Sequence, residues 1–144
     1  TVHRAAASDQ TATLQLSHIG DAPVTFSVGM VQGATVEEVP AARVAEAIPA
    51  EDASRVSFIK IDVEGYEIAA LEGARPILEA RHPAIMFEVS ADALARQGQA
   101  PADVFAYLGS YGYRFWLLKD GNFVPQSSPC EGNVFAATED LSAR

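Results

Sequence analysis

The stretch FIKIDVEGYEIAALEGA, residues 58–74, places charges inside an apolar strand pattern. Lys60, Asp62 and Glu64 occupy alternate positions and therefore share one face of a strand. Burying such charges is costly unless they are paired or take part in function. Gly65 and a helical pattern follow directly. Because ligands of open α/β sheets bind beyond the carboxyl ends of strands, this order predicts a site around Asp62 and Glu64.

Apolar periodicity in the rest of the chain predicts an α/β fold. The expected strands are 11–16, 24–28, 35–39, 57–63, 84–89, 113–118 and 133–137, and the expected helices are 41–48, 66–71, 76–80 and 103–111. The long connection between the strands at 57–63 and 84–89 indicates a parallel right-handed crossover at the centre. Asp120 and Gly121 predict a tight turn in a C-terminal antiparallel hairpin.

Two residues are expected to mark helix boundaries. Pro40 is expected to open the helix at 41–48, because the fixed φ of proline suits the first helical turn. Gly73 is expected to break the helix that begins near Tyr66.

Composition excludes several classes of protein. A chain of 144 residues with 49% hydrophobic and 20% charged residues predicts one soluble globular domain, residues 1–144. Ten basic against nineteen acidic residues give a net charge of −9, which opposes nucleic acid as a partner. No apolar run approaches the ~20 residues of a membrane span. The N-terminus lacks the apolar core of a signal peptide and an initiating methionine, so the chain is expected to be processed or a piece of something longer.

Cysteine and histidine usage indicates neither a disulfide nor a metal site. The single cysteine, Cys130, has no partner for an internal disulfide and is expected to be a free thiol in a reducing, cytoplasmic environment. His3, His18 and His82 are scattered along the chain, so no metal cluster is expected.

The segment IKIDVEGYEIAALEGA resembles the most characteristic motif of the FkbM family, S-adenosylmethionine-dependent methyltransferases that act mostly on hydroxyl groups. Weaker similarities follow the family's order along nearly the whole chain. They are Ala5-Ala6-Ala7-Ser8-Asp9 for the end of the third strand, the segment from His82-Pro83 to Glu88-Val89, Leu108 to Tyr113, and Asn133-Val134 for the last strand.

The resemblance implies a Rossmann-like methyltransferase fold that is partial, from the third strand onward. The family's glycine-rich first strand and turn, and the acidic residue ending its second strand, have no counterpart here, and no Gly-x-Gly occurs. The chain is therefore expected to be the C-terminal portion of a class I methyltransferase domain. Its implied partners are the missing N-terminal half or an oligomer partner, the cofactor S-adenosylmethionine, and a hydroxyl acceptor such as a small molecule, a sugar (glycan) or a lipid.

The resemblance also suggests roles for individual residues. Asp62 and Glu64, supported by Lys60, are the expected catalytic residues, since a carboxylate can take or orient the proton of the acceptor hydroxyl. Asp62 can also offset the positive sulfonium of the cofactor, and Ser8 and Asp9 lie where related folds approach the adenine.

Purely structural interpretations of these residues stay open. Lys60 and Asp62 can form a charge pair that fixes the strand end, with Lys60 largely buried against Glu88, Asp62 or Glu64. Glu64 can cap the following helix. Ser8 can belong to a solvent-exposed turn.

Two other functions stay open as well. Asp62-Val63-Glu64 also fits the Asp-x-acid motif of a metal-dependent sugar-nucleotide transferase, which would bind a hard divalent cation. The absence of the glycine turn allows a non-catalytic remnant or an interaction module. Cofactor titration distinguishes the remnant, and manganese dependence distinguishes the transferase.

Overall fold

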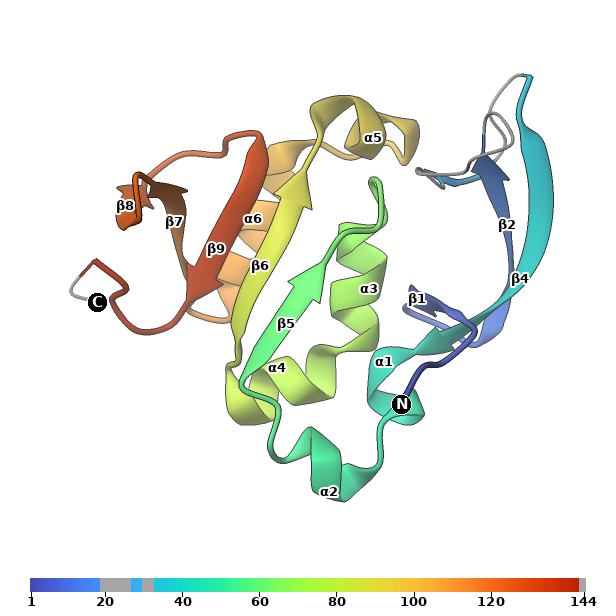
Figure 1. The fold of residues 1–144 in the computed structure, drawn as a ribbon, viewed down its shortest axis with the longest axis horizontal. Helices are drawn as coiled ribbons and strands as arrows, with labels where there is room; N and C mark the ends of the chain where they lie inside the picture. The colour runs from blue at the N-terminus through green and yellow to red at the C-terminus, as the bar shows by residue number, and fades with distance from the viewer. Residues whose placement is uncertain (19–26, 30–32, 143–144) are drawn as a thin grey trace.

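The computed structural model describes residues 1–18, 27–29 and 33–142, and Figure 1 shows its elements. The strands are β1 (Ala6–Ser8), β2 (Ala12–His18), β3 (Ser27–Val28), β4 (Thr35–Arg43), β5 (Phe58–Ile61), β6 (Ala84–Val89), β7 (Arg114–Lys119), β8 (Asn122–Gln126) and β9 (Gly132–Ala137). The helices are α1 (Val44–Ala47), α2 (Ala50–Ala53), α3 (Glu67–Gly73), α4 (Arg75–Arg81), α5 (Ala91–Arg96) and α6 (Pro101–Ser110). Of the strand expected at 24–28, residues 24–26 lie outside the described residues.

A five-stranded sheet in the order β5-β6-β9-β7-β8 forms the C-terminal part of the molecule. β5 and β6 are parallel, which confirms the parallel connection predicted through α3 and α4. β9 is antiparallel to both β6 and β7, and β7 and β8 form an antiparallel hairpin. The turn of this hairpin is Asp120-Gly121, with φ of 50° and 80°, as the sequence predicts. The mixed α/β class is confirmed.

A second, four-stranded sheet in the order β1-β4-β2-β3 lies beside the first (Figure 1). The prediction that Pro40 opens a helix is wrong. Pro40 lies within β4, opposite Thr13 of β2. β1 pairs with Ala41–Arg43 only, so β4 has a strand on just one side at Pro40. A residue without an N–H is tolerated at such a position.

α2 and α5 lie outside the predicted helices, whereas the predicted end of α3 is confirmed. α3 ends at Gly73, as predicted, and this glycine also allows close contact with β1, because a Cβ there would lie 1.9 Å from the backbone oxygen of Ser8. α5 was not expected, although Ser90 gives a usable signal, since its side chain accepts a hydrogen bond from the amide of Ala93 at 3.3 Å as an N-cap.

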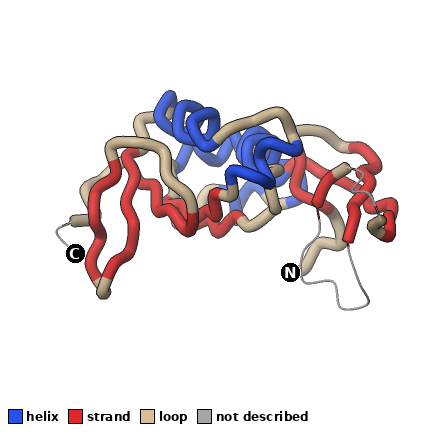
Figure 2. Tube along the Cα trace, turned by 90° about the horizontal axis from the view of Figure 1, so that it is seen from above, coloured by secondary structure: helices blue, strands red, loops and turns tan. Residues whose placement is uncertain are grey.

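The main core lies between the helices and one face of the five-stranded sheet, and Figure 2 shows the helices gathered on that side. Phe87 of β6 and Phe115 of β7 meet Phe105 of α6, with 4.3 Å between the ring centroids of Phe105 and Phe115. Trp116 belongs to a smaller cluster with Ala137 and Leu141. No helix in the described ranges is long and apolar enough to cross a membrane.

Candidate functional site

A tight turn connects β5 to α3 and carries the expected site residues. The amide of Tyr66 donates to the carbonyl oxygen of Val63 at 3.2 Å, and the two residues between them have positive φ, 52° at Glu64 and 98° at Gly65. Such a conformation is uncommon for a non-glycine residue, and it often marks a functional position. At Gly65 it comes with close packing, because a Cβ would lie 2.3 Å from the carbonyl oxygen of Ala93 in α5.

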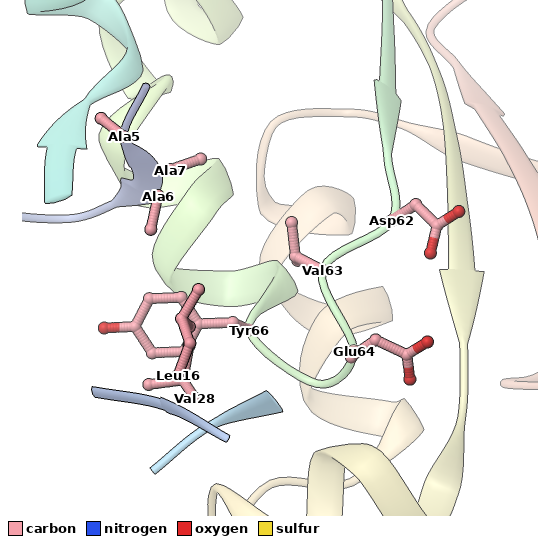
Figure 3. A pocket seen from close by; sticks show the side chains of 9 residues that line it. All are labelled: Ala5, Ala6, Ala7, Leu16, Val28, Asp62, Val63, Glu64 and Tyr66. Carbon is pink, nitrogen blue, oxygen red and sulfur yellow. The ribbon is translucent and has the colours of Figure 1, made fainter. Parts of the chain in front are cut away.

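The turn borders a cavity of about 500 Å³ (Figure 3). One wall is apolar, and its residues come from β1 and the residue before it, from β2 and β3 of the four-stranded sheet, and from the turn itself. Asp62 and Glu64 are the charged residues of the lining, and both are acidic. The lining consists of Ala5, Ala6, Ala7, Leu16, Val28, Asp62, Val63, Glu64 and Tyr66.

Asp62 and Glu64 point in the same direction. Figure 3 shows both carboxylates on the side of the turn away from the Tyr66 ring. Both residues line the cavity, and their carboxylates lie on the side of the turn opposite the apolar lining side chains, beyond the carboxyl end of β5. This position agrees with where open α/β sheets bind ligands.

The prediction that Lys60 is largely buried is wrong. Its ammonium lies 2.7 Å from Oδ2 of Asp62, and the side chains of Lys60 and Asp62 are 53% and 45% exposed. β5 is the terminal strand of its sheet, and the face that carries Phe58 and Lys60 is open to solvent. The partner is Asp62 and not Glu88, because the register places Lys60 opposite Met86.

Glu64 does not cap α3, since the N-cap of this helix is Tyr66 and no side chain bonds to its first amides. The capping interpretation of Glu64 is therefore wrong. The left-handed backbone of Glu64 instead belongs to the turn that precedes the helix.

Ser8 is fully buried, so the interpretation of this residue as part of a solvent-exposed turn is wrong. Its hydroxyl donates to Oδ1 of Asp9 at 3.1 Å and lies 3.5 Å from the hydroxyl of Tyr66. Neither Ser8 nor Asp9 lines the cavity. Ser8 instead lies behind Tyr66, which does.

Two residues of the site were missed at the level of sequence. Tyr66 contributes its ring to the cavity wall, and the only sequence signal is an aromatic residue directly after the glycine of a strand–turn–helix motif. Glu67, the first residue of α3, is 2% exposed. An acidic residue in the first turn of a helix ordinarily indicates a favourable interaction with the helix dipole. Nothing in the neighbouring sequence therefore predicts that Glu67 is buried.

The Glu67 carboxyl is held by the turn. Its Oε1 accepts a hydrogen bond from the amide of Gly65 at 3.1 Å, while Oε2 is buried without a hydrogen-bond partner in the described part of the chain. Burial raises the pKa of Glu67, and the negative charges of Glu64 and Asp62 raise it further against the lowering effect of backbone hydrogen bonds.

The described residues, those of this site included, contain no group of three or more His, Cys, Asp or Glu side chains placed to hold a metal ion. Cys130 is a free, half-buried cysteine packed against the main core, and burial raises the pKa of its thiol. A raised pKa lowers the thiolate fraction, so its surroundings do not favour nucleophilic chemistry.

Comparison with protein families gives one result that bears on the site. The family model described as "Methyltransferase FkbM domain" matches residues 1–115, which include both walls of the cavity and the whole of β5, α3, α5 and α6. No curated protein and no solved structure matches the chain.

Proposed function

The chain belongs to the methyltransferase FkbM domain family, and from this membership we propose that it is the C-terminal portion of an S-adenosylmethionine-dependent O-methyltransferase. The proposed reaction is methyl transfer to a hydroxyl of a small molecule, a sugar or a lipid. The observation that carries the proposal is the turn at residues 62–66, which places two carboxylates at the carboxyl end of β5 and at the rim of a cavity of about 500 Å³.

The lining of the cavity fits the proposed cofactor. When bound, S-adenosylmethionine supplies a methyl group attached to a positively charged sulfonium. The charged lining residues, Asp62 and Glu64, are both negative and suit a cation, whereas the apolar wall with Tyr66 suits a flat aromatic base. We assign Asp62 to the cofactor on this ground. Ser8 and Asp9 support the cavity wall from behind. The Ser8 hydroxyl donates to Asp9 and lies 3.5 Å from the hydroxyl of Tyr66.

The acceptor requires help with its proton. Transfer of a methyl group to a hydroxyl is a displacement that needs the oxygen in line and its proton removed. Asp62 is 45% exposed and Glu64 lies on the same side of the turn, so both are open to an incoming hydroxyl. We propose that one of these carboxylates takes the proton and that Lys60, 2.7 Å from Asp62, orients the Asp62 carboxylate.

An open edge of β5 supports the proposal that further strands complete the domain. β5 pairs with β6 on one side, and in the described structure no strand pairs with its other side. A cavity of about 300 Å³ lies beside this strand, and its lining includes Ala7 of β1, Ile59 of β5, Ala70 of α3 and Ala74, the C-cap of α3. Unpaired strand edges accept additional strands. We propose that the N-terminal half of the domain, or an oligomer partner, pairs here.

A cytoplasmic location is part of the same proposal. Its support is the free Cys130, which is compatible with a reducing compartment.

The test uses the complete methyltransferase that the proposal implies, of which this chain is a part; it is called the natural protein below. Its turnover is measured with S-adenosylmethionine and a panel of glycan, lipid and polyketide-like hydroxyl acceptors, and formation of S-adenosylhomocysteine is the readout. We expect acceptor-dependent product that a chelator does not abolish. A glycosylated acceptor that forms only with added manganese and a sugar nucleotide would instead favour the metal-dependent sugar-nucleotide transferase. Cofactor binding without transfer to any acceptor class would favour a non-catalytic remnant or interaction module.

A further inference from the structure

Glu67 is the one charged residue among the buried polar side chains of the described chain, the others being Ser8, Ser17 and Ser27. Its carboxyl lies next to the turn that carries the proposed catalytic carboxylates. A buried acid in this position is expected to have a defined task, because its burial opposes ionisation.

The contact of Glu67 acts on the backbone of the turn. Oε1 of Glu67 accepts from the amide of Gly65 at 3.1 Å in a buried hydrogen bond. The turn has two other constraints, the hydrogen bond from Tyr66 to Val63 and the packing of Gly65 on α5. Among the described residues, Glu67 is the one whose side chain hydrogen-bonds to the middle of the turn.

Glu64 is the residue whose direction depends on this contact. Its φ of 52° is disfavoured for a residue with a side chain, so the turn must be held in place from outside. Release of the Gly65 amide would let Glu64 relax toward a right-handed backbone. Its carboxylate would then leave the side of the turn that it shares with Asp62 (Figure 3).

We propose that Glu67 is a positioning residue of the site, which holds the Gly65 amide and so fixes the direction of the Glu64 carboxylate. The inference rests on the proposed function, because it assigns Glu67 a task in the same methyl transfer. To hold the Gly65 amide, the side chain of residue 67 needs an oxygen that accepts a hydrogen bond, and it does not need a negative charge. A neutral Glu67 keeps a carbonyl oxygen that can accept the same hydrogen bond.

Two substitutions separate this role from simple packing. Glu67→Gln keeps the length of the side chain and an acceptor oxygen, whereas Glu67→Met keeps similar volume and removes the acceptor. A residue that only fills space would tolerate methionine. Glu79 is a matched control, since it is a glutamate of the next helix, α4, with a side chain that is 57% exposed.

The first readout is hydrogen exchange of the Gly65 amide, measured by NMR on this chain. We expect Glu67→Gln to exchange as the wild type does and Glu67→Met to exchange about tenfold faster, the scale of one lost hydrogen bond. Glu79→Met should leave Gly65 exchange unchanged. Unchanged exchange in Glu67→Met would overturn the proposal.

The second readout is kcat and KM of the natural protein. We expect Glu67→Met to lower kcat about tenfold or more with KM for S-adenosylmethionine within about twofold, and Glu67→Gln to retain kcat within about threefold. Faster Gly65 exchange with an unchanged kcat would show that the turn does not position the site, and would overturn the proposal. If Glu67→Met does not fold, Glu67→Gln decides: wild-type exchange and kcat support the proposal, and a loss of either overturns it. A wild type without methyl transfer would refute the proposed function alone, because the exchange readout is independent of activity.

Discussion

At the scale of single residues, the exposure of the ion pair between Lys60 and Asp62 determines how much it contributes to stability. With side chains that are 53% and 45% exposed, the pair is of the kind that contributes about 0–1 kcal/mol to stability. The pair would have to be buried to stabilise the strand end strongly, but the face of β5 that carries Lys60 is open to solvent. The Asp62 carboxylate is therefore accessible to ligands at little cost to the fold.

Replacing Asp62 with asparagine keeps its size and removes its charge. We expect methyl transfer by the natural protein to fall about 10²-fold or more, the scale of losing a general base. We expect the free energy of unfolding to fall by no more than about 1 kcal/mol, because the ion pair is exposed. Turnover and thermal unfolding of the same variant check both statements.

The matched control is Asp52→Asn, which breaks another exposed pair, between Arg55 and Asp52 at 2.6 Å. It should change stability by a similarly small amount and leave turnover unchanged. Near-normal turnover in Asp62→Asn would leave Asp62 as a surface partner of Lys60 and contradict its assignment to the site.

Glu67 makes stability depend on pH. Its pKa in the folded protein is raised above the ordinary 4.5, so the folded state binds this proton more tightly than the unfolded state does. This stabilisation is fully present below pH 4.5 and is lost as the pH rises through the raised pKa. Glu67→Gln carries no such proton. We expect urea unfolding to show Glu67→Gln more stable than the wild type at pH 7, with the difference largely gone at pH 4. The same difference at both pH values would contradict this account.

At the scale of elements, α3 is the part of the chain that joins the two sheets at the site. Its N-terminus follows the turn on β5, and its C-terminal residue, Gly73, touches the backbone of β1 at Ser8. α5 contacts the turn through Ala93. Arg96 at its end and Gln97, its C-cap, donate hydrogen bonds to β3, to the Ser27 hydroxyl and the Val28 carbonyl respectively. The cavity therefore lies between elements that these two helices connect.

Two helical glycines should respond in opposite ways to alanine. At Gly73 a Cβ would lie 1.9 Å from the Ser8 oxygen, so we expect Gly73→Ala to destabilise the protein by about 1–3 kcal/mol as α3 and β1 separate. At Gly109 of α6 a Cβ meets nothing within 4 Å, and we expect Gly109→Ala to stabilise it by about 0.5–1 kcal/mol. Urea unfolding measures both, and a stable Gly73→Ala variant would refute the close approach of α3 to β1.

At the scale of the whole molecule, the two sheets end in strands that each lack a neighbour on one side. In the described part of the chain, β5 ends the five-stranded sheet and β1 ends the four-stranded sheet (Figure 1). Both contribute residues to the cavity of about 300 Å³, which α3 also lines. The exposed side chain of Phe58, at 52%, lies on β5 as well. These features are those of a sheet able to accept more strands.

Cofactor affinity tests whether such strands are needed. We expect this chain alone to bind S-adenosylmethionine with a Kd above about 100 μM, because the glycine-rich turn that holds the cofactor in related folds has no counterpart in the sequence. Calorimetric titration of this chain, with the natural protein as the control, measures the difference. A micromolar Kd for this chain alone would mean that it builds a complete cofactor site by itself.

Local patterns in the sequence determined the strand–turn–helix at residues 58–74, the parallel pairing of β5 with β6 and the hairpin turn at Asp120-Gly121. Each follows from periodicity and turn chemistry within a few neighbouring residues. The same patterns also indicated the FkbM family, since its motif is contiguous in the chain.

Burial was decided by the tertiary structure. Lys60 is exposed because the face of β5 that carries it is open to solvent, and Pro40 fits a strand because β4 has one neighbour at that point. Ser8 and Glu67 are buried because α3 and the turn pack against segments distant in sequence. A side chain's exposure depends on these remote neighbours, whereas its backbone conformation depends mostly on adjacent residues. The sequence therefore predicted where the turn lies, and the packing around it decided which of its acids face solvent and which acid holds it.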